Sequence, residues 1–183
     1  MKLFRLLSII LLILLLPACN NNASVENTLN DFIGREVSLP LQTMRSMKNG
    51  KDTTLAKPIS GSYKEIAFVD SSVCTSCMYR HLYKWIPIIE EAKEKGHDVE
   101  FIFILHPAKS SRIGLYHEMM QPQIFSETVF VDTAGIFARS NPSIPDANIY
   151  HYFLLDEDNR VVMVGDPTRN QKLHDLFFSK LKP

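Results

Sequence analysis

The sequence lacks internal repeats, low-complexity tracts and a second long hydrophobic run beyond the one at its N-terminus. These absences argue against a repeat array and against a second membrane-spanning segment. Neither sign of charge is in excess, since 20 Lys and Arg residues balance 20 Asp and Glu residues among 183. Without a basic stripe, the charge pattern suggests no nucleic-acid partner. The length suits one domain with its own hydrophobic core.

The N-terminus has the features of an export signal. Lys2 and Arg5 make it positive, and residues 6–16 are apolar apart from Ser8. About eleven such residues are too few to cross a bilayer as a helix, which needs roughly twenty. Residues 1–18 are therefore predicted to be a cleaved signal peptide, whose removal leaves the mature chain with a formal net charge of −2.

Residues 16–19, Leu-Pro-Ala-Cys, resemble the lipobox of bacterial lipoproteins. The resemblance implies that Cys19 becomes the N-terminus and carries lipid, with residues 19–34 forming the lipidated cysteine and a polar tether. Each buried methylene of an acyl chain contributes about 0.8 kcal/mol to membrane attachment. Because asparagines rather than acidic residues follow Cys19, the resemblance also implies an anchor that faces the periplasm, with the outer membrane preferred. The alternative is an ordinary signal peptide with Cys19 as a bystander.

The other two of the three cysteines, Cys74 and Cys77, are separated by only two residues. An exported chain enters a compartment in which disulfides form and persist. The loop that this pair would close is too short for a disulfide to stabilise the fold much through chain entropy. The pair is therefore predicted to have a chemical rather than a structural role.

Residues 35–62 are predicted to be a short N-terminal β extension. Residues 35–41 have the pattern of a strand, and Asn49-Gly50 is the typical signal of a tight hairpin turn.

From residue 63 onward, apolar strands alternate with helical segments, which predicts an α/β domain over residues 63–183. Strands are expected at residues 65–70, 99–105, 128–132, 152–156 and 160–165, the last two forming a hairpin. Helices are expected at residues 74–95, with a kink or a division at Pro87, and at 109–121, 133–139 and 170–181.

A strand, a Cys-x-x-Cys pair at the start of a helix, a second strand, and a late hairpin followed by a helix resemble the thioredoxin fold, an α/β fold whose central mixed sheet is flanked by helices. Residues 128–139 and the hairpin from residue 153 are more specifically similar to the TlpA/ResA-like lipoproteins of Bacteroidetes-type bacteria. The resemblance implies a membrane-tethered periplasmic thiol-disulfide oxidoreductase. Such a protein reduces protein disulfides, needs no cofactor and exchanges electrons with a redox partner protein.

Two positions depart from that family. In the family a cis-proline precedes the hairpin strand and faces the dithiol, but here the slot holds Ile149, Tyr150 or His151, and no proline is closer than Pro145. Many members also have a buried acid in the strand before the dithiol, where this chain has Phe68. The departures favour a second hypothesis, a non-catalytic binding lipoprotein that keeps the fold.

The dithiol has a defined chemistry if Cys74 begins the helix. Its sulfur would then meet unpaired amide N–H groups and the positive end of the macrodipole, which favour the thiolate that attacks a disulfide. Cys77, one turn later, would resolve the resulting mixed disulfide. Asp70, His106 and His151 are candidates to tune the thiolate or to move a proton.

Metal binding is a third hypothesis. Cys74, Cys77 and His81 share one helical face at a spacing compatible with Cu(I) or Zn(II). The copper chaperones of the Sco family use a Cys-x-x-x-Cys spacing that this chain does not match. We therefore assign no metal site.

Overall fold

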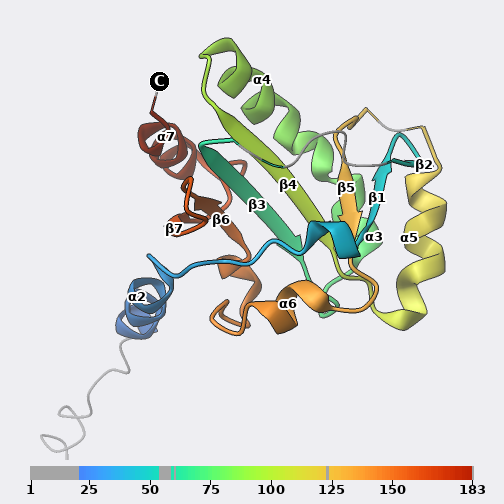
Figure 1. The fold of residues 1–183 in the computed structure, drawn as a ribbon, viewed down its shortest axis with the longest axis horizontal. Helices are drawn as coiled ribbons and strands as arrows, with labels where there is room; N and C mark the ends of the chain where they lie inside the picture. The colour runs from blue at the N-terminus through green and yellow to red at the C-terminus, as the bar shows by residue number, and fades with distance from the viewer. Residues whose placement is uncertain (1–20, 54–58, 60, 123, 183) are drawn as a thin grey trace, which may run out of the picture.

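The computed structural model describes residues 21–53, 59, 61–122 and 124–182. One seven-stranded sheet forms its centre, with the strands in the order β2-β1-β5-β4-β3-β6-β7 (Figure 1). The strands are β1 Arg45–Lys48, β2 Lys51–Asp52, β3 Tyr63–Val69, β4 Val99–Leu105, β5 Val129–Val131, β6 Tyr152–Leu155 and β7 Val161–Val164. The α-helices are α2 Asn21–Phe32, α3 Thr75–Arg80, α4 Ile86–Glu94, α5 Arg112–Met119, α6 Ile136–Ser140 and α7 Gln171–Lys180. Short 3-10 helices lie at Leu41–Thr43, Leu82–Trp85, Lys109–Ser111 and Asn148–Tyr150.

The central strand β3 is parallel to β4 on one side and antiparallel to β6 on the other. Parallel neighbours need a crossover connection, which α3 and α4 supply between β3 and β4. β6 and β7 then form an antiparallel hairpin, and α7 follows. A β-α-β unit, a hairpin and a final helix around the strand order β4-β3-β6-β7 are the elements of the thioredoxin-like fold. The predicted fold class is confirmed.

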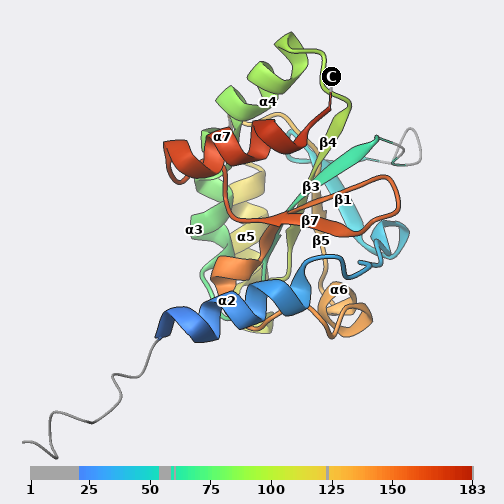
Figure 2. The ribbon, with the colours of Figure 1, turned by 90° about the vertical axis from the view of Figure 1, so that its left-hand side faces the viewer.

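Helices cover both faces of the sheet. Figure 2 shows α3, α4, α5 and α7 on one side of the strands and α6 on the other. Residues 66–69 of β3 and 102–105 of β4 are consequently buried on both faces, which explains why these strands are apolar runs rather than alternating ones. Because β3, β4 and β5 are parallel, their carboxyl ends lie at one edge of the sheet, where the segment with the two cysteines begins.

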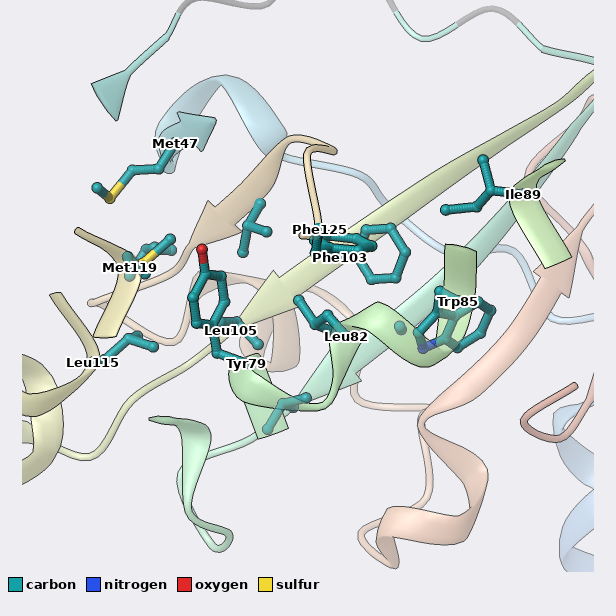
Figure 3. Close-up of a cluster of buried hydrophobic side chains, with 14 residues drawn as sticks. Met47, Tyr79, Leu82, Trp85, Ile89, Phe103, Leu105, Leu115, Met119 and Phe125 are labelled. Atoms are coloured by element: carbon teal, nitrogen blue, oxygen red, sulfur yellow. The ribbon is translucent and has the colours of Figure 1, made fainter. Parts of the chain in front are cut away.

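One large buried cluster lies between the sheet and the segment that carries the cysteines (Figure 3). Tyr79, Leu82 and Trp85 of that segment belong to the same cluster as Phe103 and Leu105 of β4. The rings of Trp85 and Phe103 meet edge to face with their centroids 5.5 Å apart. Full burial of one such side chain contributes about 1.5–3 kcal/mol, so the cluster holds α3 firmly on the sheet.

The helix predicted for residues 74–95 is divided, but the division does not lie at Pro87. The chain instead forms α3, the 3-10 helix Leu82–Trp85 and then α4. A 3-10 helix has three residues per turn, which keeps Trp85 on the same buried side as Tyr79, six residues earlier. Pro87 does not cause the break, because it lies in the first turn of α4, where its missing N–H costs nothing.

The hairpin turn predicted at Asn49-Gly50 is confirmed. It joins β1 to β2, and both turn residues have positive φ, 51° and 72°. The strand predicted over residues 35–41 is wrong, since this stretch contributes only an isolated bridge between Glu36 and Arg160. β1 pairs with β5, so the predicted β extension forms one edge of the main sheet.

The described part of residues 19–34, the segment predicted to be a polar tether, forms the helix α2. The last residue of α2, Phe32, is 1% exposed and meets Phe153 of β6 edge to face, with ring centroids 5.3 Å apart. Val37 joins Phe32 in the buried cluster on the α6 side of the sheet. The aromatic ring therefore anchors this segment to the domain. None of the described helices is long and apolar enough to cross a membrane.

An acid that the sequence analysis overlooked is buried in the middle of β3. Glu65 is 1% exposed, and neither carboxyl oxygen finds a hydrogen-bond partner among the described residues. Burial, reinforced by the carboxylate of Asp166, raises the pKa of Glu65 well above its usual value. A buried acid thus does lie in this strand, three residues before Phe68. The signal was available, because Glu65 is a charged residue directly before the apolar run of residues 66–69.

We expect Glu65→Gln to raise the free energy of unfolding at neutral pH by roughly 1–3 kcal/mol. Because the folded-state pKa is raised, the folded protein holds a proton that the unfolded chain releases above a pH of about 4.3. The free energy of unfolding of the wild type should therefore fall as the pH rises above that value. The variant should lack this part of the pH dependence. Urea unfolding at several pH values measures the effect, with Glu94→Gln at an exposed position of α4 as the control. An identical pH dependence of the free energy of unfolding in wild type and Glu65→Gln would contradict the prediction.

Candidate dithiol site

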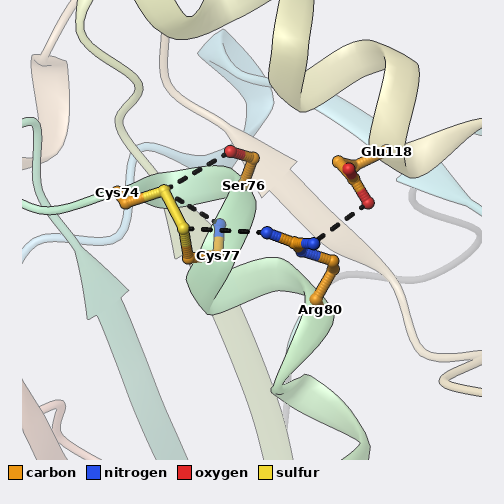
Figure 4. Close-up of a disulfide and its surroundings, with 5 residues drawn as sticks. All are labelled: Cys74, Ser76, Cys77, Arg80 and Glu118. Atoms are coloured by element: carbon orange, nitrogen blue, oxygen red, sulfur yellow. Dashed lines mark hydrogen bonds and ion pairs between the residues drawn. A yellow bond between two sulfur atoms is a disulfide. The ribbon is translucent and has the colours of Figure 1, made fainter.

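The two cysteines lie where the chain leaves the carboxyl end of β3 and enters α3. Cys74 is the N-cap of α3 and Cys77 lies within its first turn. They form a disulfide, with Cα atoms 5.2 Å apart (Figure 4). Cys74 is exposed and Cys77 is half-buried. The pair therefore presents the sulfur of Cys74 to solvent.

The sulfur of Cys74 has the local contacts of a helix cap. The backbone N–H of Cys77 donates to Cys74 Sγ at 3.3 Å, and Ser76 Oγ lies 3.5 Å from the same sulfur. The macrodipole expected from a long helix is reduced, because α3 has only six residues. The direct N–H contact is therefore what stabilises negative charge on Cys74.

A basic side chain that the sequence analysis missed lies beside the second cysteine. Nη2 of Arg80 is 3.9 Å from Cys77 Sγ, and Nε of Arg80 is 3.8 Å from Oε2 of Glu118 on α5 (Figure 4). The spacing of three residues between Cys77 and Arg80 on a helix was a usable signal for the first contact. The contact with α5 depends on tertiary structure.

Two of the predicted tuning residues, Asp70 and His151, are brought together next to the dithiol loop. Oδ1 of Asp70 accepts hydrogen bonds from the backbone N–H and the hydroxyl of Ser72, at 2.7 and 2.5 Å. Oδ2 of Asp70 is 3.7 Å from Nδ1 of His151, which is 3% exposed. Burial lowers the pKa of His151, although Asp70 and the carbonyl of Pro145, 3.0 Å from Nε2, oppose this effect. The imidazole is therefore favoured in its neutral form.

The loop before β6 is tied to the loop before Cys74. Nδ2 of Asn148 donates to the hydroxyl of Ser72 at 3.4 Å, and the N–H of Phe68 donates to the carbonyl of His151 at 2.9 Å. His151 thus occupies the position just before β6 that the sequence analysis compared with the cis-proline slot. No cis peptide bond occurs in the part of the chain that the structure describes.

The third predicted tuning residue, His106, lies elsewhere. It follows β4 and packs against Gly135, where an added Cβ would come within 2.9 Å of its Cε1 atom. Within the described ranges, His106 makes no hydrogen bond to either cysteine.

The described residues provide no cluster of ligands that would support the metal-binding hypothesis. His81 is exposed at the end of α3, with its ring 6.3 Å from that of Tyr83. Among the described residues, no group of three or more His, Cys, Asp or Glu side chains could hold a metal ion.

Two cavities lie close to α3 and to the loop before β6, and neither has Cys74 or Cys77 in its lining. The first, of about 400 Å³, begins at Met78, directly after Cys77, and includes Trp85 in its lining. The second, of about 230 Å³, reaches Ile149 in the loop before β6. Tyr152, Asp166 and Arg169 line both cavities, which are therefore neighbours.

Cys19, the predicted lipid attachment site, lies outside the described residues.

Comparisons with known proteins reveal distant likeness only. No protein-family model matches the chain, and no curated protein matches it either. An exposed lipoprotein thioredoxin of Streptococcus pneumoniae is 16% identical, with 67% of this chain and 87% of that chain covered and a TM-score of 0.45. The thioredoxin domain of a thiol-disulfide oxidoreductase from Bacteroides vulgatus is 11% identical over 82% and 98%, with a TM-score of 0.46. Peroxiredoxin Q of Xanthomonas campestris is 16% identical over 81% and 96%, with a TM-score of 0.47.

These likenesses are too distant to assign an activity. The order and direction of its own strands and helices show that this chain has a thioredoxin-like α/β fold, with a Cys74–Cys77 disulfide at the carboxyl edge of its sheet.

Proposed function

We propose that the protein is a thiol-disulfide oxidoreductase that reduces protein disulfides through Cys74 and Cys77. One observation carries the proposal: the two sulfurs are within bonding contact at the start of a helix, and the first of them is exposed. A bridge between residues three apart adds little to stability. Its exposed position instead suits exchange with a second molecule.

The exchange takes place in two steps. The thiolate of Cys74 attacks one sulfur of the substrate disulfide, so that one substrate sulfur leaves as a thiolate and a mixed disulfide forms. Cys77 then loses its proton and attacks Cys74 Sγ, which breaks the mixed disulfide and releases the second substrate thiolate. The substrate gains two electrons, and the Cys74–Cys77 pair is oxidised. A dithiol of a redox partner protein returns the pair to its reduced form.

The two neighbouring cavities support a polypeptide substrate. They extend from Met78, the residue after Cys77, to the loop before β6, and Met78, Trp85 and Tyr152 give them apolar walls. In this proposal, the side chains of an extended peptide occupy the cavities while its disulfide reaches Cys74. Asp70 and His151 contribute indirectly in this scheme, because they hold the loops on either side of the dithiol.

We place the protein at the membrane through lipid on Cys19, facing the periplasm and most consistent with the outer membrane. The resemblance of residues 16–19 to a lipobox supports this placement. The described part of the chain begins at residue 21, close behind that cysteine.

A redox titration of the purified protein combined with an assay of insulin reduction tests the proposal. The Cys74–Cys77 pair should titrate reversibly against glutathione as a two-electron couple, and the reduced protein should accelerate the reduction of insulin. A pair that titrates while no test disulfide is reduced would favour the alternative, a binding lipoprotein on a thioredoxin-like scaffold. That alternative draws its support from the non-proline residues before β6.

A further inference from the structure

The guanidinium of Arg80 lies between Cys77 and a carboxylate on a neighbouring helix. Its Nη2 is 3.9 Å from Cys77 Sγ, and its Nε is 3.8 Å from Oε2 of Glu118. Figure 4 shows the side chain reaching from α3 toward α5, with the disulfide on one side and Glu118 on the other. The side chains of Arg80 and Glu118 are 55% and 27% exposed, so the ion pair holds the cation at the surface of the site.

The two sulfurs of the pair have different neighbours. Cys74 Sγ has neutral ones, the N–H of Cys77 at 3.3 Å and the hydroxyl of Ser76 at 3.5 Å. Cys77 Sγ instead faces the cation of Arg80. A nearby cation stabilises a thiolate far more than a neutral thiol or a disulfide sulfur. The contact therefore becomes strong only when Cys77 ionises.

We propose that Arg80 favours the thiolate of Cys77 and thereby accelerates the release of the substrate. The inference rests on the exchange reaction proposed above. In the release step, Cys77 gives its proton to solvent and its sulfur attacks Cys74 Sγ. The bond between Cys74 and the substrate breaks, the Cys74–Cys77 bond forms, and the substrate leaves as a thiolate. Arg80 thus acts on the second step, whereas the first attack depends on the groups around Cys74.

The first experiment measures the acidity of Cys77 directly. In the full chain, Cys19→Ser combined with Cys74→Ser leaves Cys77 as the single thiol, and its ionisation can be followed by the ultraviolet absorbance of the thiolate. Adding Arg80→Gln should raise the pKa of Cys77, because the cation is lost, whereas Arg80→Lys should keep most of the effect. High salt should shrink the difference, since the pair is partly exposed. Arg139→Gln, at an exposed position of α6 on the other face of the sheet, should leave Cys77 unchanged.

The second experiment follows a single turnover with Cys74 and Cys77 intact. Below the pKa of Cys77, Arg80→Gln should slow substrate release about two- to fourfold, because the thiolate fraction falls faster than its nucleophilicity rises. Well above that pKa the same variant should release substrate faster than wild type, since the less acidic thiol gives the stronger nucleophile. Formation of the mixed disulfide should be unchanged. A loss of structure would slow both steps at every pH and would show no such reversal.

The results distinguish a failure of the role proposed for Arg80 from a failure of the proposed exchange reaction. If Arg80→Gln leaves both the pKa of Cys77 and the release rate unchanged at every pH, the role of Arg80 is wrong and the exchange reaction stands. If Cys77→Ser traps no mixed disulfide and the wild-type protein reduces no test disulfide, the proposed function is wrong, and the thiolate titration still decides whether Arg80 acts on Cys77.

Discussion

Cys77→Ser should accumulate mixed disulfides with its substrates, and Cys74→Ser should form none. The asymmetry follows from the contacts, because the exposed sulfur of Cys74 accepts the N–H of Cys77 while Cys77 is half-buried one turn later. Without Cys77 the first attack still occurs, but no second thiol releases the substrate. Both variants should reduce disulfides no faster than the uncatalysed reaction. A non-reducing gel of protein incubated with oxidised insulin would show the adducts, and dithiothreitol should remove them.

Cys19→Ser in the same purified protein is the matched control for this experiment, because it removes a cysteine outside the site and should leave the reaction intact. If Cys74→Ser traps as much substrate as Cys77→Ser does, the order of attack is the reverse of the one proposed. If neither variant traps anything and the wild type reduces nothing, the protein is better described as a binding lipoprotein.

A second large effect is expected from Cys19→Ser in cells. Only a cysteine at this position can take the thioether-linked lipid that a lipobox specifies, so the variant should move from the membrane fraction to the soluble fraction. If Cys19 carries lipid, the anchor should be strong, because each acyl methylene contributes about 0.8 kcal/mol and several chains act together. Fractionation after a high-salt wash measures the shift, since the wash removes proteins held by charge alone.

The control for that shift is Ser24→Ala, a small change five residues further along that leaves the lipobox intact and should remain with membranes. Retention of Cys19→Ser on washed membranes would show that the attachment does not depend on lipid at this cysteine. The chemistry of Cys74 and Cys77 would be unaffected by that result, because the two proposals rest on separate parts of the chain.

The main elements of the domain could be predicted because their signals are local. Continuous apolar runs predicted β4 at its observed bounds and β3 to within two residues, and Asn49-Gly50 predicted its hairpin turn. The helical segments were found, but the interruption at residues 82–85 was not. Apolar spacing of three and of four residues is shared by α and 3-10 segments, and packing against the sheet decides between them.

Errors concentrated at the N-terminus, where the sequence is polar. Residues 21–32 have few apolar positions, and the tether hypothesis followed from that composition. That composition did not predict that one aromatic side chain, Phe32, fixes the end of this segment to the domain by lying against Phe153. Contacts between residues so far apart leave no periodic pattern in a single sequence.

The sequence by itself determined the reactive pair and the order of elements around it, because a Cys-x-x-Cys after an apolar strand places both sulfurs at a helix start. Only the tertiary structure decided which groups surround those sulfurs. It brings Asp70 close to His151 and places His106 beside Gly135. It also places Arg80 between Cys77 and Glu118. The reason is physical: the direct electrostatic influence of a charged group on a thiolate depends on a separation of a few ångströms. For residues far apart in the chain, that separation is set by how the helices and loops pack on the sheet.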